Sequence, residues 1–97
     1  MNLNNLDKVR QYQNAIRDAL LKEWDPIGIN AIAEAQDEYD AYVWTVYKLL
    51  IEGKQKNDIL DYLWWLETEH MGLTGDRQAT ERFAERLLRL RADLERE

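Results

Sequence analysis

The spacing of apolar residues constrains the fold of this chain more than any other feature. Apolar residues recur at every third or fourth position over long segments without a turn signal. In residues 5–24 this spacing places one apolar stripe along a helix. Four glycines and one proline in 97 residues are too few for the frequent turns of an all-β domain. The sequence therefore predicts a helical protein. The stripe of this first segment comprises Leu6, Val9, Tyr12, Ile16, Leu20 and Trp24.

Breaks in the apolar pattern divide the chain into further helices. The first helix should stop at Asp25, because a residue that precedes proline is pushed out of the α region. Gly53 offers the left-handed backbone that ends many helices, and residues 71–76 have the composition of a short break. The expected helices are residues 5–24, 37–52, 57–70 and 77–95.

Four helices with mostly short connections predict an all-α fold, a small antiparallel bundle that forms one domain over residues 1–97. The longer connection, residues 25–36, leaves room for one helix to cross the others. The last helix has a heptad-like apolar seam, which either completes the chain's own core or forms a homodimer. This seam comprises Thr80, Phe83, Leu87, Leu90 and Leu94.

Charge is unevenly distributed along the chain. The formal net charge is −6, and the stretch from Glu23 to Tyr47 holds six carboxylates with no Lys or Arg. Direct nucleic-acid binding is not expected, because neutralising phosphates requires a basic surface. An acidic surface attracts a basic protein partner instead. The acids that begin the second helix exceed what capping requires, and they are therefore candidate contacts. They are Asp37, Glu38 and Asp40.

Asp25 and an adjacent pair of tryptophans add to these candidates. The Asp25 carboxylate either accepts hydrogen bonds from nearby backbone N–H groups in the turn or contacts a partner. Trp64 and Trp65 lie about 100° apart around a helix, so both cannot point inward. An exposed Trp beside acidic residues is typical of a protein-binding hot spot. A helix buried between two neighbours, on different faces, is the alternative.

The residue inventory excludes several kinds of catalysis. The chain has no Ser, no Cys and a single His, so a Ser/His/Asp or Cys/His triad cannot be built. No glycine-rich phosphate loop is present. The metal-dependent alternative uses Glu67 and His70, whose three-residue spacing occurs in carboxylate-bridged di-iron bundles. The competing interpretation is that Glu67 and Glu69 are solvated and that His70 ends the helix, where a cation suits the helix dipole.

No signal peptide is expected from the first residues, and the sequence has no apolar run of the roughly 20 residues needed to cross a bilayer. A cytoplasmic location without membrane contact is therefore the expectation, and the absence of cysteine is compatible with it.

Several short strings together indicate a family. They are WDPIG at residues 24–28, DEYDAY at 37–42, YLWWLE at 62–67 and MGL at 71–73. With these strings the chain resembles a family of small bacterial helical proteins of unknown function, over roughly residues 20–73. The resemblance implies a helical fold and no catalytic residue, and some similar proteins look like immunity proteins encoded beside toxins. This chain departs from the family pattern at Ile29, where valine is usual, and in its arginine-rich last helix.

The sequence thus predicts an acidic, non-enzymatic protein-binding module without a cofactor, which neutralises a basic partner as immunity proteins and antitoxins do. The expected contacts are Asp25, Asp37, Glu38, Asp40, Trp64 and Trp65. One alternative is an inhibitor that mimics nucleic acid in the basic groove of a nuclease or effector. The other alternative is a metal-dependent helical-bundle enzyme with Glu67 and His70 as ligands.

Overall fold

The computed structural model describes residues 4–25 and 39–96. These residues form helices and their connections, with no strand, so the all-α prediction is confirmed for the described part of the chain. The helices are α1 (Asn4–Ala19) with a π-helical turn (Leu20–Trp24), α2 (Asp40–Ile51), α3 (Lys56–Trp65) with a π-helical turn (Leu66–His70), and α4 (Arg77–Glu95).

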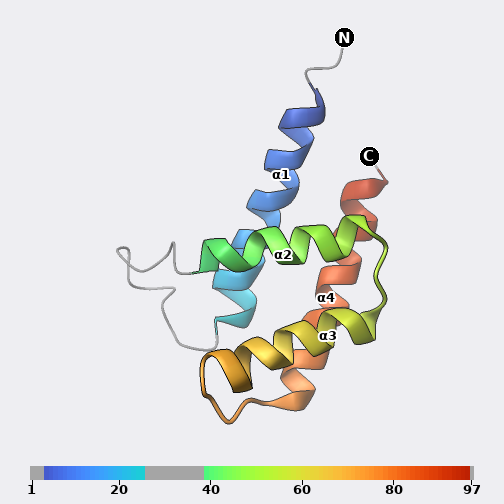
Figure 1. The fold of residues 1–97 in the computed structure, drawn as a ribbon. Coiled ribbons are helices and arrows are strands. Elements are labelled where there is room, and N and C mark those ends of the chain that lie inside the picture. Colours follow the sequence, from blue (N-terminus) through green and yellow to red (C-terminus); the bar gives the residue numbers. More distant parts are fainter. Residues whose placement is uncertain (1–3, 26–38, 97) are drawn as a thin grey trace.

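The helices form two antiparallel pairs that cross each other. In Figure 1, α1 and α4 run in opposite directions, and α2 and α3 lie across them, also in opposite directions. Side-chain contacts agree with this picture: the Tyr12 hydroxyl donates to Glu95 Oε2 at 3.4 Å, and Arg86 Nε donates to Glu23 Oε1 at 3.0 Å. The predicted antiparallel bundle is confirmed, with a pair of helices, rather than a single helix, lying across the others.

Local chemistry explains where the helices end. The first helical segment stops at Asp25, whose φ is 28° and whose N–H donates to the Leu20 carbonyl, five residues back, at 2.7 Å. Gly53 follows α2 with a φ of 75°, as predicted for a glycine that ends a helix. Asp76 is the N-cap of α4: its carboxylate accepts a hydrogen bond from the Ala79 N–H at 3.2 Å. The predicted start of the second helix at residue 37 lies outside the described residues.

The core is built from one stripe on each helix. The α4 seam completes this core, since its first four members are buried and Leu94 is partly buried against them. None of the helices in the described ranges is long and apolar enough to cross a membrane. Fully buried apolar side chains from the four helices include Ile16, Leu20, Val46, Leu50, Ile59, Leu63 and Leu87.

Candidate functional site

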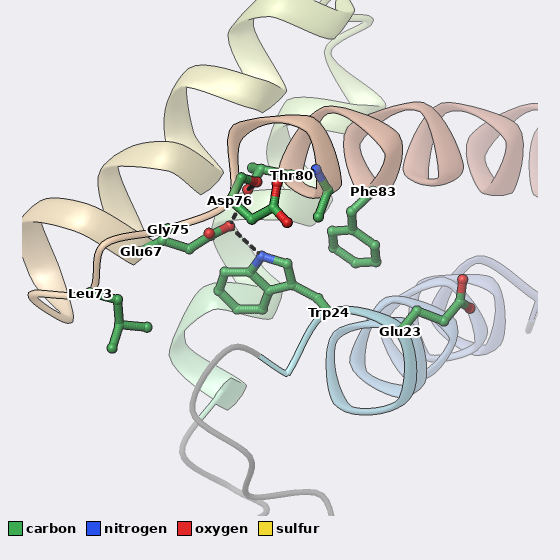
Figure 2. Close-up of a pocket in the computed structure, with 9 residues that line it drawn as sticks. Glu23, Trp24, Glu67, Leu73, Gly75, Asp76, Thr80 and Phe83 are labelled. Carbon is green, nitrogen blue, oxygen red and sulfur yellow. Dashed lines mark hydrogen bonds between the residues drawn. The ribbon is translucent and has the colours of Figure 1, made fainter.

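The two π-helical turns place Trp24 and Glu67 side by side. Trp24 Nε1 donates a hydrogen bond to Glu67 Oε2 at 2.8 Å, and Thr80 Oγ1 lies 2.7 Å from the same oxygen (Figure 2). The Thr80 hydroxyl also lies 2.9 Å from the Asp76 carbonyl oxygen, so its one proton serves two acceptors. Glu67 is only 5% exposed. Trp24 from the first π-helical turn and Thr80 from α4 thus both bind the buried carboxylate of the second π-helical turn.

A cavity of about 320 Å³ opens beside this carboxylate. Its walls combine aromatic and apolar side chains with carboxylates, and none of the residues that line it is basic. The rings of Trp24 and Phe83 stack within the wall, with centroids 6.1 Å apart and planes 15° apart. The lining residues are Glu23, Trp24, Glu67, Leu73, Gly75, Asp76, Ala79, Thr80 and Phe83, most of which are labelled in Figure 2.

The prediction that Glu67 is solvated was wrong. Glu67 lies four residues after Leu63 on the buried stripe of α3, so its position at a core-facing site was a signal in the sequence. His70 has different surroundings: it is exposed, and its ring contacts Tyr42 and Trp65. In the described part of the chain, no group of three or more His, Cys, Asp or Glu side chains could hold a metal ion.

A second candidate is the outer surface of α3, where an aromatic side chain lies among acids. Trp65 is 49% exposed. Asp61 and Glu69, one helical turn before and after it, are also exposed, and none of the ion pairs among the described residues involves either carboxylate. No Lys or Arg occurs between Lys56 and Arg77. We call this surface the α3 face: Asp61, Tyr62, Trp65, Glu69 and His70.

Neighbouring rings hold Trp65 in place. The Trp65 ring stacks on Tyr62, with centroids 6.4 Å apart, and on His70, with centroids 5.4 Å apart. The His70 ring in turn meets the Tyr42 ring edge-on at 5.9 Å. Burial raises the pKa of Tyr62, and a hydrogen bond with Thr45 partly offsets the rise. Tyr42 and Thr45 belong to α2, so the aromatic side chains of the α3 face are fixed against a second helix.

Two predicted contact residues have partners within the chain. The Asp25 carboxylate accepts a hydrogen bond from the Tyr39 hydroxyl at 2.9 Å, a contact that joins the end of the first helix to the start of α2. Arg17 Nε lies 2.9 Å from Asp40 Oδ1, an ion pair without the alignment of a hydrogen bond. Asp40 therefore has a cation beside it already. Asp37 and Glu38 lie outside the described residues.

The two adjacent tryptophans differ in exposure. Trp64 is half-buried: the Arg77 guanidinium lies 5.2 Å from its ring, and Gly75 packs on that ring. Trp65 is the exposed member. The prediction that at least one of the pair lies at the surface is confirmed. Asp61, Tyr62 and Glu69 were not among the predicted contacts, although their spacing of three or four residues from Trp65 places them on the same side of a helix.

Comparison of the chain with protein-family models, with curated proteins and with solved structures gives no significant match. The family resemblance in its sequence stays a prediction.

Proposed function

We propose that this protein is a binding module that neutralises a basic protein partner, as immunity proteins and antitoxins do, and that the α3 face is the surface it uses. The observation that carries this proposal is the half-exposed Trp65 with Asp61 and Glu69 one turn away on either side. Aromatic residues at the centre of an interface supply much of its binding energy. The flanking carboxylates select a partner of opposite charge.

The packing of Trp65 against two neighbouring rings supports its role as the central contact. Binding costs entropy whenever a mobile side chain must be ordered, about 0.5–1.5 kcal/mol for a side chain with many rotamers. The stacking of Trp65 on Tyr62 and His70 reduces that cost, because the indole is already held in one position. A free surface of this kind binds a partner without first reorganising.

Charge determines the kind of partner. The chain has a formal net charge of −6, and residues 57–76 contain acids but no Lys or Arg. A basic protein is attracted toward such a surface, and its association rate falls as salt is added. Asp37 and Glu38 stay candidate contacts on the evidence of the sequence alone, whereas Asp40, which is paired with Arg17, contributes less.

Affinity capture from the host's lysate tests the proposal, with bound proteins quantified by mass spectrometry. We expect Trp65→Ala, and separately Asp61→Asn with Glu69→Gln, to lower recovery of a basic partner about tenfold or more, as hot-spot substitutions do. The matched control is Trp44→Ala, since Trp44 is 55% exposed but lies on α2. Equal recovery with Trp65→Ala and with the unchanged chain would contradict the assignment of the α3 face.

The alternatives give different results in the same system. A mimic of nucleic acid competes with DNA or RNA for its partner, whereas binding through Trp65 does not require such competition. A metal-dependent enzyme contains stoichiometric metal after purification without chelator.

A homodimer formed through α4 would have to use residues outside its seam, because Phe83, Leu87 and Leu90 are buried in the chain's own core.

A further inference from the structure

The buried carboxylate of Glu67 has one oxygen engaged and one that takes no part in the contacts described above. Both hydrogen bonds that the described residues make to this carboxylate end on Oε2. Glu67 lines the cavity, and Figure 2 shows its second oxygen beside the one that is bonded. A buried carboxylate costs free energy unless it is paired or hydrogen-bonded. Oε1 is therefore available to accept a hydrogen bond from a ligand in the cavity.

We propose that this cavity binds a primary alkylammonium group, from a free alkylamine or from a lysine side chain, with Glu67 Oε1 as the acceptor. The cavity lies between the start of α4 and the two π-helical turns, and it does not include the α3 face. The proposal therefore stands apart from the proposed function, and either can fail without the other.

The charge and shape of the walls favour an organic cation. No basic residue lines the cavity, and of its three carboxylates Glu23 is paired with Arg86 at 3.0 Å. The charges of Glu67 and Asp76 therefore disfavour an anion. The aromatic wall of Trp24 and Phe83 suits the alkyl part of the ligand and attracts an adjacent cation. A volume of about 320 Å³ is near the lower end of the range for small-molecule sites, which indicates a short ligand.

Hydrogen-bond geometry selects ammonium over guanidinium. A guanidinium binds a carboxylate best with two parallel N–H donors, one to each oxygen. Trp24 and Thr80 already occupy Oε2 of Glu67. A single-point donor such as an ammonium needs Oε1 alone. The site is therefore expected to discriminate between two cations of equal charge.

The test uses the full chain labelled with ¹⁵N and follows the Trp24 indole N–H signal by NMR, after Trp24→Phe has identified it. The ligands are n-butylammonium chloride, n-butylguanidinium chloride and sodium butyrate at equal ionic strength. We expect saturable shifts with butylammonium, binding of butylguanidinium at least about fivefold weaker, and no saturable shift with butyrate. A peptide with one central lysine and blocked ends shows whether the cavity also accepts a lysine side chain.

Matched variants decide whether Glu67 is the acceptor. Glu67→Gln keeps the side-chain shape and should weaken butylammonium binding about tenfold or more, whereas Glu52→Gln, an equal charge change at an exposed site after α2 and outside both the cavity and the α3 face, should alter it less than about twofold. Ala79→Leu fills the cavity from α4 and should abolish binding in a folded chain, which keeps the test valid if Glu67→Gln does not fold. Absent shifts with butylammonium, equal shifts with butyrate, or equal losses in Glu67→Gln and Glu52→Gln would overturn the proposal.

Discussion

Trp24 and Glu67, which are 43 residues apart in the sequence, form a hydrogen bond of 2.8 Å across the interior. Each residue lies in a π-helical turn that follows a regular α-helix. Such turns are rare in proteins and occur often at functional sites. Here the two turns bring an indole N–H and a carboxylate to the same cavity wall. The pair is therefore both a link between helices and part of a candidate binding site.

Replacing Trp24 with Phe should destabilise the fold. The substitution removes one of the two donors to a carboxylate that is 5% exposed, and loss of a bond to a buried charged group costs about 1–3 kcal/mol. Urea unfolding followed by circular dichroism measures this loss. Trp44→Phe is the control, because Trp44 is exposed and should change the free energy of unfolding by less than about 0.5 kcal/mol. Similar losses in the two variants would mean that the bond to Glu67 contributes nothing.

Thr80→Val should also lower stability, because valine keeps the shape of threonine but cannot donate to Glu67. Thr80 is 2% exposed, and its hydroxyl lies 2.7 Å from the carboxylate oxygen. We expect a loss of about 1–3 kcal/mol in the free energy of unfolding, measured by urea titration. The exposed Thr74→Val is the matched control, with little change expected. A Thr80→Val variant as stable as the parent would show that the hydroxyl is dispensable.

Gly75→Ala should cost more stability than Gly72→Ala. Both glycines have positive φ, 80° and 72°, so both substitutions place a side chain in left-handed backbone, at about 1–2 kcal/mol. A Cβ at Gly75 would also lie 2.8 Å from the Trp64 ring, whereas a Cβ at Gly72 meets nothing within 4 Å. The difference between the two variants in thermal or urea unfolding isolates the contact with Trp64. Equal losses would mean that the Trp64 ring moves aside freely.

The fold should lose stability above about pH 10, the ordinary pKa of tyrosine. Burial, reinforced by Glu95, raises the pKa of Tyr12 well above that value. Above pH 10 the unfolded chain therefore releases the Tyr12 proton while the folded chain retains it, and the free energy of unfolding falls as pH rises. Below pH 10 this stability is fully present. Urea unfolding between pH 8 and pH 11 should show a flatter decline in Tyr12→Phe than in the parent, and parallel declines would contradict the assignment.

The positions of the helices could be predicted from the sequence because they depend on interactions between residues close together in the chain. The signals that set the helix ends act within a few residues of the chain. They are the apolar spacing, Asp25 before Pro26, Gly53 after α2 and Asp76 before α4. Helix α4 begins and ends where the sequence predicted it, whereas α3 begins at Lys56, one residue earlier than predicted. The crossing of the α2/α3 pair over α1 and α4 depends on contacts between distant residues, which no local pattern specifies.

The candidate sites were only partly predictable for the same reason. Trp65 could be proposed as a surface residue because two adjacent helical positions cannot both face the core. The sequence could place Glu67 and Thr80 on apolar stripes, but it could not show that they meet each other and Trp24. The π-helical turn from Leu66 also affects His70, which lies four residues after the buried Leu66 and is nevertheless exposed, because a wider turn changes the angle between successive side chains.

The contacts between α1 and α4 have a consequence for synthesis of the protein. A ribosome delivers α1 first and α4 last, yet Tyr12 bonds to Glu95, and Phe83, Leu87 and Leu90 complete the core. Until residue 95 has emerged, the apolar stripes of the earlier helices lack their final cover. The nascent chain is then open to aggregation or to chaperones, and the finished fold forms only after α4 is released.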